Sequence, residues 1–348
     1  MQGGIEIAGL SPLVIPVFVS NLGCPHRCVF CDQRQFATPM PPETIRAYAD
    51  EFISGCRPKG ARRCILGFFG GSFTGIDDNL FENYLDVTRS LIEQGMIQGA
   101  KASTRPDMVS KDIVRRLRES GFEELEIGIQ SMDERVLEAS SRGHSRDDAV
   151  RACKMVKDSG MRLGVQLMPG LPGEDSPSFK QTVDALAELH PDTARIYPTT
   201  VLAGTGLEVL YNNGGYRPLS LEEAVKRALY AAIVLEGLGC TILRMGLPQS
   251  PGLRVIAGPY HPSFGFLVRA FGYRMMAQRM VDELGDGCEL QVHSRDIPEL
   301  IGYRRSTLED LRFSYSFNDA LPRGYIRAYD ASRESACIQL QDILEYIL

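Results

Sequence analysis

The 348-residue sequence lacks several features that would assign it to a broad class at once. It has no run of 18 apolar residues, so we expect no transmembrane helix. It also has no excess of positive charge, because 38 Lys and Arg side chains face 44 Asp and Glu, which gives a net charge of −6. This balance disfavours a generally basic binder of nucleic acid or membrane surfaces and leaves room for a local basic patch.

The amino-terminal sequence MQGGIEIAGLSP lacks the basic start and the apolar stretch of a secretory signal. We therefore expect a cytoplasmic protein that does not bind membranes. The nine cysteines do not predict a disulfide framework in such a chain. Three of them, Cys24, Cys28 and Cys31, stand within eight residues, and this clustering is the first indication of chemistry.

Strands and helices alternate over the first two-thirds of the chain. Apolar or β-branched runs predict strands, and amphipathic segments with a Ser or Pro near their start predict helices. The predicted strands cover 13–20, 64–69, 99–104, 124–130, 161–168 and 193–198, and the predicted helices cover 41–53, 78–95, 111–120, 145–160, 177–189 and 219–239. Six such units predict an α/β fold, a partial (β/α)6 TIM-like barrel, with an open Rossmann-like sheet as the alternative.

The alternation ends near Cys240. A stretch rich in Gly and Pro over 245–265 predicts a loop, and the segments that follow predict a helix over 266–284, a strand over 289–294 and a helix over 307–314. We expect a core domain over residues 1–240. A small α+β C-terminal region over 241–348 is expected to serve substrate binding or an accessory role.

The cysteine loop, NLGCPHRCVFCDQRQFA, follows the first predicted strand directly. In a parallel α/β fold it therefore lies at the carboxyl edge of the sheet, where binding sites form. The spacing C-x3-C-x2-C offers three thiolates to a 4Fe–4S cube and leaves the fourth iron open for a substrate. A zinc site with His26 as the fourth ligand is the alternative, although zinc sites usually combine pairs of ligands from two chain segments.

The loop, placed after the first strand of a six-unit sheet, resembles the radical S-adenosylmethionine (radical SAM) superfamily over about residues 13–240. The branch that it resembles contains the radical domain of the Elongator catalytic subunit and oxygen-independent coproporphyrinogen III oxidase. The resemblance implies that Cys24, Cys28 and Cys31 hold a 4Fe–4S cluster whose open iron chelates S-adenosylmethionine (SAM). It also implies reductive cleavage of SAM to a 5′-deoxyadenosyl radical, which abstracts hydrogen from an unidentified substrate.

The resemblance implies cofactor contacts at the ends of successive strands. A glycine pair meets the methionine amino group, an arginine pairs with its carboxylate, and polar or apolar neighbours contact the ribose and the adenine. The implied contacts are Phe30, Gly70, Gly71, Ser72, Gln130, Arg142, Gln166 and Pro198. Ser72 stands where many members have an acid. Of two further candidates, we expect Arg105 to form a structural ion pair and His144 to lie at the surface.

Chemistry of this kind needs a one-electron donor such as flavodoxin or ferredoxin. The two branches suggest either a tRNA base or a small anionic metabolite as the substrate. The sequence assigns no catalytic residue beyond the cofactor ligands. The alternative function is a zinc- or cluster-bearing RNA-binding module without radical chemistry, which the net negative charge disfavours.

Overall fold

The computed structural model describes residues 12–20, 22–31, 38–55, 63–249, 252–330, 332 and 335–348. Residues 1–11, which carry the expectation about a signal peptide, lie outside these ranges, as do Asn21 and residues 32–37 of the cysteine loop. Within the described ranges, no helix is long and apolar enough to cross a membrane. The chain divides into two compact units, residues 1–166 with 191–193 and residues 167–190 with 194–348.

A seven-stranded sheet has the order β1-β2-β3-β4-β5-β6-β8. Its strands are β1 (Leu13–Phe18), β2 (Cys64–Phe69), β3 (Ala100–Thr104), β4 (Phe122–Gln130), β5 (Arg162–Leu167), β6 (Thr193–Ile196) and β8 (Thr241–Met245). The pairs β1–β2, β2–β3 and β3–β4 are parallel. The strands follow one another in chain order, whereas a doubly wound sheet reverses its order at a switch point. The partial TIM-like barrel is therefore confirmed, and β8 adds a seventh strand that was not predicted.

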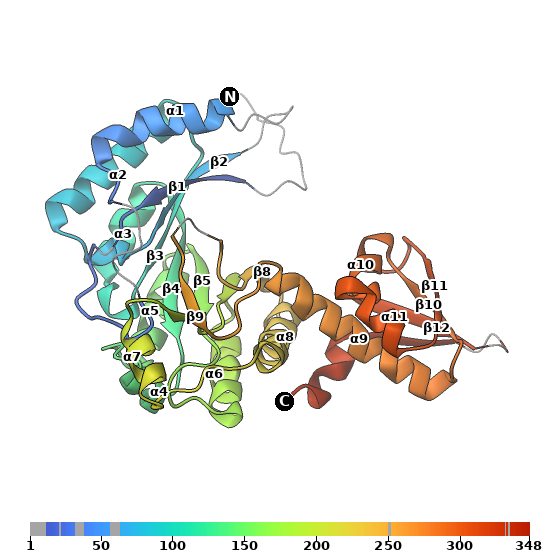
Figure 1. Ribbon diagram of the computed structural model, residues 1–348. Helices are drawn as coiled ribbons and strands as arrows, with labels where there is room; N and C mark the ends of the chain where they lie inside the picture. Colours follow the sequence, from blue (N-terminus) through green and yellow to red (C-terminus); the bar gives the residue numbers. More distant parts are fainter. Residues whose placement is uncertain are drawn as a thin grey trace. The chain divides into compact units, whose positions relative to one another are not determined.

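The helices of the first unit cover one side of its strands, where α1, α2 and α3 lie outside β1 to β4 (Figure 1). The helices are α1 (Ile45–Gly55), α2 (Asp78–Glu93), α3 (Lys111–Glu119), α4 (Glu134–Ala139) and α5 (Arg146–Asp158). Ser145 begins α5 with a capping box that it shares with Asp148, because its hydroxyl accepts from the Asp148 N–H and the Asp148 carboxylate accepts in return. The short helix α4 was not predicted.

A cluster of buried aromatic rings forms the core beneath the first strand ends. Phe68 at the end of β2 stacks on Phe73 with 4.3 Å between ring centroids, and Tyr84 of α2 meets Phe68 edge-on at 5.6 Å. Phe122 of β4 lies 5.6 Å from Phe73. Because Phe68 and Phe73 flank it, the turn of residues 70–72 is fixed at both ends by core packing.

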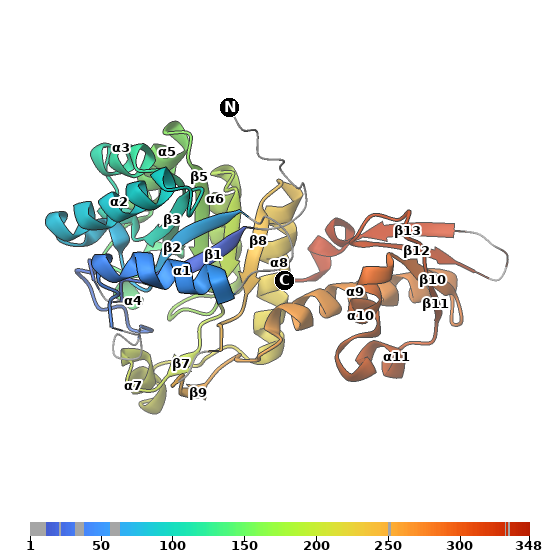
Figure 2. The same ribbon diagram turned by 90° about the horizontal axis from the view of Figure 1, so that it is seen from above.

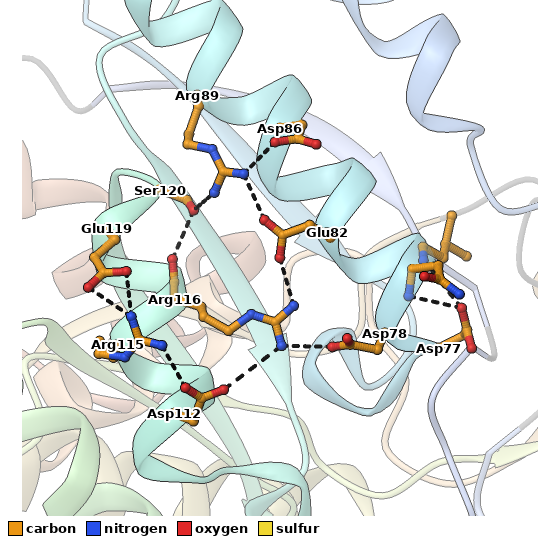
Figure 3. A network of polar contacts seen from close by, with 12 residues as sticks. Asp77, Asp78, Glu82, Asp86, Arg89, Asp112, Arg115, Arg116, Glu119 and Ser120 are labelled. Carbon is orange, nitrogen blue, oxygen red and sulfur yellow. Dashed lines mark hydrogen bonds and ion pairs between the residues drawn. The ribbon is translucent and has the colours of Figure 1, made fainter.

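Helices α2 and α3 are joined by a network of ion pairs (Figure 3). The Arg116 guanidinium of α3 donates to Asp78 and to Glu82 of α2, both at 2.7 Å. Arg89 donates to the second oxygen of Glu82 at 2.7 Å and to the Ser120 hydroxyl at 2.7 Å. Hydrogen bonds from Arg89 and Arg116 lower the pKa of the Glu82 carboxyl. The network holds together the helices that follow β2 and β3.

The second unit ends in a four-stranded sheet with the order β11-β10-β12-β13, whose strands lie side by side in Figure 2. Beyond β6 and β8 the unit contains α6 (Ser176–Glu188), β7 (Val201–Leu202), α7 (Gly206–Asn212), α8 (Leu221–Gly237), β9 (Val255–Ala257), α9 (Phe264–Leu284), β10 (Glu289–Val292), α10 (Ile297–Ile301), α11 (Ser306–Asp310), β11 (Ser314–Phe317), β12 (Tyr325–Tyr329) and β13 (Ser335–Gln339). The predicted small α+β region is confirmed.

The helix predicted over 307–314 is wrong in its second half. Helix α11 ends at Asp310, and the chain then enters strand β11, which pairs in parallel with β10. Pairing with a strand that precedes it by more than twenty residues is a tertiary contact, and such contacts override local helix propensity.

A buried carboxylate joins α9 to the C-terminal sheet. Asp296, which is 1% exposed, accepts hydrogen bonds from the Tyr273 hydroxyl at 2.5 Å, from Arg323 at 2.6 Å and from the Gly324 N–H at 3.0 Å. Burial raises the pKa of Tyr273, with the hydrogen bond to Asp296 adding to the effect. One carboxylate therefore fixes the helix and the segment that leads into β12.

The loop that follows β5 is held by a buried ion pair within the second unit. One oxygen of Glu174 accepts from the Gly170 N–H at 2.6 Å and from the Arg227 guanidinium of α8, while the Tyr216 hydroxyl donates to the Gly170 carbonyl at 2.6 Å. The other Glu174 oxygen is buried, with no hydrogen-bond partner among the described residues. Burial raises the pKa of Glu174 to about 7, although the Gly170 N–H and Arg227 oppose the shift.

Replacement of Arg227 with Met should lower the free energy of unfolding by about 3 to 5 kcal/mol at pH 8, because it leaves Glu174 buried without its cation. The loss should shrink as the pH falls. Without Arg227 the folded-state pKa of Glu174 rises further above its unfolded value, so the folded variant takes up a proton that the unfolded chain does not. Urea unfolding at pH 8 and at pH 5.5 measures both effects.

The matched control is Lys226→Met, which removes a neighbouring cation of α8 that pairs with Glu222 at the surface. Exposed pairs of this kind contribute at most about 1 kcal/mol, so the control should lose little stability at either pH. An Arg227→Met variant that is destabilised equally at both pH values would contradict a charged, buried Glu174 as the cause.

Candidate functional site

The three clustered cysteines lie on the segment that leaves the carboxyl end of β1. Cys28 is buried, Cys24 and Cys31 are partly exposed, and the Cys31 N–H donates to the Cys28 carbonyl at 3.1 Å in a tight turn. The Val29 N–H donates to the Ser140 carbonyl at 3.1 Å, which ties the loop to the end of α4. Among the described residues, no three His, Cys, Asp or Glu side chains converge as ligands of a single ion. A 4Fe–4S cube takes one thiolate per iron, so its ligands need not converge on one point.

The loop crosses the turn after β2 at a distance that only glycine allows. Gly23 has φ +72°, and a Cβ there would lie 2.2 Å from the Ser72 carbonyl oxygen. A Cβ on Gly71 would lie 2.6 Å from the Val19 carbonyl oxygen and 2.7 Å from that of Leu22. Both glycines therefore serve the close approach of two backbone segments. The predicted cofactor contact of Gly70 and Gly71 stays a prediction.

Two buried guanidiniums face the Cys28 sulfur. Arg142, which is 5% exposed, places Nη1 3.2 Å from Cys28 Sγ, and Arg105, which is 4% exposed, places Nη1 3.8 Å from the same atom. Arg142 also donates to the Gly128 carbonyl, while its buried Nε has no partner among the described residues. Arg105 forms a two-pronged pair with Asp107, with Nε–Oδ1 at 3.0 Å and Nη2–Oδ2 at 3.1 Å.

The two positive charges beside the Cys28 sulfur favour the binding of a negatively charged group at this site. Burial raises the pKa of the Cys24 thiol, while the charges of Arg105 and Arg142 and a backbone hydrogen bond from Ser72 oppose the shift. Burial lowers the pKa of Arg142, because its charge is removed from water, and the nearby charge of Arg105 adds to the effect. Asp107 is the counter-ion of Arg105. The positive charge of Arg142 is therefore left for the thiols or for a bound anion.

Hydroxyl groups at the ends of β2 and β3 bond to one another. Ser72 Oγ lies 2.8 Å from Thr104 Oγ1 and accepts from the Arg105 N–H at 3.2 Å. Thr74 Oγ1 lies 2.6 Å from Thr104 Oγ1 and donates to the Met108 carbonyl. Ser72 is fully buried and its hydroxyl is engaged inside the protein. The predicted contact between Ser72 and the cofactor stays a prediction.

Two predicted contacts meet at the ends of β4 and β5. Gln166 Nε2 donates to Gln130 Oε1 at 3.1 Å, which fixes the orientation of both amides. Gln130 has φ +72°, a left-handed conformation that costs a residue with a side chain about 1 to 3 kcal/mol. Strain of this kind gathers at functional sites, where the surroundings hold a side chain in place. Here it turns the last residue of β4 out of strand geometry.

His144 is buried, so the expectation that it lies at the surface is wrong. It is 6% exposed because the chain turns inward between Arg142 and the start of α5. Gly143, with φ +68°, makes that turn, and a Cβ there would lie 2.5 Å from the His26 ring. Burial lowers the pKa of His144 to about 3, with the charges of Arg142 and Arg105 adding to the effect.

The structure gathers most of the predicted site in the first unit. The Arg142 guanidinium lies 6.0 Å from the centre of the Phe30 ring, which places Phe30 beside the buried cations. Pro198, in contrast, belongs to the second unit. The expected structural ion pair of Arg105 is confirmed, and its partner is Asp107. The approach of Arg105 to Cys28 was missed. These residues are 77 positions apart, and only the adjacency of strand ends in the fold could have indicated the contact.

The residues present fit a thiolate-bound cluster. Cys24 and Cys28 carry free thiols, and the buried Arg142 supplies a positive charge whose Nε has no hydrogen-bond partner in the described part of the chain. The guanidinium fork matches carboxylates, and Arg142 Nη1 also faces the Cys28 sulfur, so the residues around Cys28 can hold both an anionic cluster and an amino-acid carboxylate. The donor set, three cysteines on one loop beside cationic N–H groups, is typical of an iron–sulfur site.

Replacement of His144 with Leu should flatten the pH dependence of stability. In the wild-type protein the folded-state pKa of His144 lies far below that of the unfolded chain. Its contribution is therefore present above pH 6.5 and is lost as the pH falls, by about 1.4 kcal/mol per pH unit. Urea unfolding between pH 7.5 and pH 5 measures the slope.

The control is Leu137→Ala, which removes apolar contacts of a buried α4 residue that lines the same pocket as His144. This variant should lose stability by a similar amount at every pH, because no titrating group changes. A His144→Leu variant with the wild-type slope would show that another group carries the pH dependence.

Comparison with known proteins agrees with this geometry. The Radical SAM superfamily model matches residues 19–186, and the Radical_SAM C-terminal domain model matches residues 191–272. A tRNA uridine(34) acetyltransferase of Methanocaldococcus jannaschii is 27% identical over 263 residues, which are 64% of this chain and 49% of that protein. Elongator complex protein 3 of Mus musculus is 36% identical over 138 residues, 38% of this chain and 25% of that protein.

The chain spans about half the length of the archaeal relatives that it matches. The solved structure of Methanocaldococcus infernus Elp3 with an N-terminal deletion gives a TM-score of 0.61 at 24% identity, covering 77% of this chain and 63% of that chain. It shares the fold. The family matches do not favour a binding module without radical chemistry. The chain belongs to the radical SAM superfamily and is an enzyme of that superfamily, whose cofactors are a 4Fe–4S cluster and SAM.

Proposed function

We propose that this enzyme uses its cluster and SAM to abstract hydrogen from a base of tRNA. The observation that carries the proposal is the three-cysteine loop whose Cys28 sulfur faces two buried guanidiniums. The substrate class is supported by matched relatives that are named tRNA uridine(34) acetyltransferases. A small anionic metabolite is the alternative substrate class.

The residues of the first unit have separate roles in this proposal. The thiolates of Cys24, Cys28 and Cys31 would hold a 4Fe–4S cluster through three of its irons, so that the fourth would be available to SAM. When bound, the two cofactors supply reductive cleavage of SAM and the 5′-deoxyadenosyl radical that takes hydrogen from the substrate. Arg142 orients the methionine carboxylate with N–H groups that its own burial keeps away from water.

Further residues complete the proposed cofactor pocket. The backbone at Gly70 and Gly71, the amides of Gln130 and Gln166, and the side chains of Phe30, Ser72 and Pro198 are the remaining SAM contacts. The Gln166–Gln130 hydrogen bond supports a fixed orientation of the two amides. We also propose that residues 1–240 are the radical SAM core and that residues 241–348 form a C-terminal substrate or accessory region.

An electron donor needs access to the cluster. Pro25, His26 and Arg27 are exposed between the first two cysteines, and they support a docking position for a one-electron donor such as flavodoxin or ferredoxin. A cytoplasmic location, where such donors and tRNA occur together, belongs to the same proposal.

Anaerobic reconstitution with iron and sulfide should give a 4Fe–4S cluster, and the loaded protein should form 5′-deoxyadenosine from SAM when dithionite is added. Cys24→Ala, Cys28→Ala and Cys31→Ala should each lose stable cluster assembly and all nucleoside formation, because each removes one iron ligand. Iron analysis, electron paramagnetic resonance and chromatography of the nucleoside measure these outcomes.

Cys337→Ala is the control for the cysteine series, because Cys337 is exposed in β13 and lies outside the loop. It should keep full iron content and full activity. A single tetrahedral zinc in the wild-type protein, or a fully loaded cluster that yields no 5′-deoxyadenosine, would contradict the proposed function.

Addition of tRNA lacking its modifications should increase 5′-deoxyadenosine formation several-fold over the rate with SAM alone. Substrates raise the rate because hydrogen abstraction consumes the radical productively. When the tRNA is deuterated, the label should appear in the 5′-deoxyadenosine, which mass spectrometry detects. Stimulation by a pool of small anionic metabolites and not by tRNA would assign the alternative substrate class.

A further inference from the structure

Arg105 has contacts that the proposed function does not use. Its guanidinium is almost fully buried and is held on two sides, by the two-pronged pair with Asp107 and by a hydrogen bond from Nη2 to the Arg142 carbonyl. The remaining terminal nitrogen, Nη1, faces Cys28 Sγ at 3.8 Å. These anchors engage Nε and Nη2 and leave Nη1 as the nitrogen that faces a proposed cluster ligand.

The anchoring makes the position of this charge unusually well defined. A guanidinium is a rigid planar fork, so fixing Nε and Nη2 also fixes Nη1. The Arg105 N–H donates to Ser72 Oγ at 3.2 Å, which fixes the backbone of the same residue. Neither the carboxylate nor the carbonyl that holds the side chain belongs to the cysteine loop.

Both guanidiniums meet the same sulfur. Arg142 Nη1 lies 3.2 Å from Cys28 Sγ, and Asp107 balances one of the two positive charges. Arg105, Arg142 and Asp107 together carry a net charge of +1 next to Cys28. Hydrogen bonds to the sulfurs and local charge are two factors that set the potential of an iron–sulfur cluster.

We propose that Arg105 is a positioning residue that raises the reduction potential of the cluster through the Cys28 thiolate. The inference rests on the proposed function, because it requires a cluster at Cys28. Reduction is a one-electron step in which the donor loses one electron, the cluster gains one, and Arg105 keeps its proton. The added negative charge is stabilised by a fixed cation and an N–H donor that are themselves buried, so Arg105 stabilises the reduced state more than the oxidised state.

The test is a redox titration of the loaded, SAM-free protein monitored by electron paramagnetic resonance. Arg105→Gln should move the midpoint to a more negative potential, with the ratio of reduced to oxidised cluster at a fixed potential falling about tenfold, equivalent to about 59 mV for one electron. Arg105→Lys keeps the charge without the fork and should shift the midpoint less. Arg115→Gln should leave the midpoint unchanged, because Arg115 pairs with Asp112 and Glu119 at the surface.

An Arg105→Gln protein with full iron content and the wild-type midpoint would overturn the inference and leave the proposed function intact. Arg105→Gln and Arg105→Lys proteins that fold, as judged by circular dichroism, but fail to load iron would also overturn it, because Arg105 would then shape the loop and not the potential. A wild-type protein that binds no cluster would overturn the proposed function together with the inference.

Discussion

Close contact between the cysteine loop and the turn after β2 determines where the thiols lie. The chain passes Ser72 and Val19 so closely that a methyl group at Gly23 or Gly71 would overlap backbone oxygens. Backbone cannot move aside as a flexible side chain can, so the two glycines are required by geometry. The turn itself is anchored by Phe68 and Phe73 in the aromatic core. Packing of the aromatic core therefore fixes the turn after β2, and the turn fixes the position of the cysteine loop through backbone contact.

Charge at the site is arranged around a few buried groups. Arg142 is buried and its Nε has no hydrogen-bond partner among the residues that the structure covers, while Arg105 pairs with Asp107. His144 stays neutral because burial and the two cations disfavour a further positive charge. An unpaired buried cation is costly to a protein that binds no anion. Iron-bound thiolates and the carboxylate of SAM would each reduce that cost, so the same groups that destabilise the empty site favour its cofactors.

Local patterns in the sequence were sufficient for most of the barrel. The strands at 64–69 and 193–196 and the capped helix α5 follow from apolar runs, Ser145 and Asp148, all of which act within a few residues. Strand β8 was missed because TILRM has no alternation that separates it from a loop, and it joins the sheet through pairing. Strand β11 was likewise not predicted, because it forms through pairing with β10, and the helix predicted over 307–314 ran past the end of α11 as far as Ser314.

The parts of the candidate site that depend on residue type and spacing could be predicted from the sequence. The parts that depend on which residues lie close together in the fold could not. Three cysteines at this spacing indicate metal ligands without any structure. The approach of Arg105 to Cys28 depends on the adjacency of strand ends, and the burial of His144 depends on the path of the chain after Gly143. No pattern around these residues indicates either property.

Asp296 links helix α9 to the segment that leads into the C-terminal sheet. Asp296 binds the Tyr273 hydroxyl of α9 and the Gly324 amide before β12, and the Gly324 amide also donates to the Tyr273 hydroxyl at 2.9 Å. Loss of either partner would leave a buried polar atom without a hydrogen bond. Helix α9 and strand β12 should consequently open to solvent as one cooperative unit, with the Gly324 amide exchanging its hydrogen only when α9 unpacks.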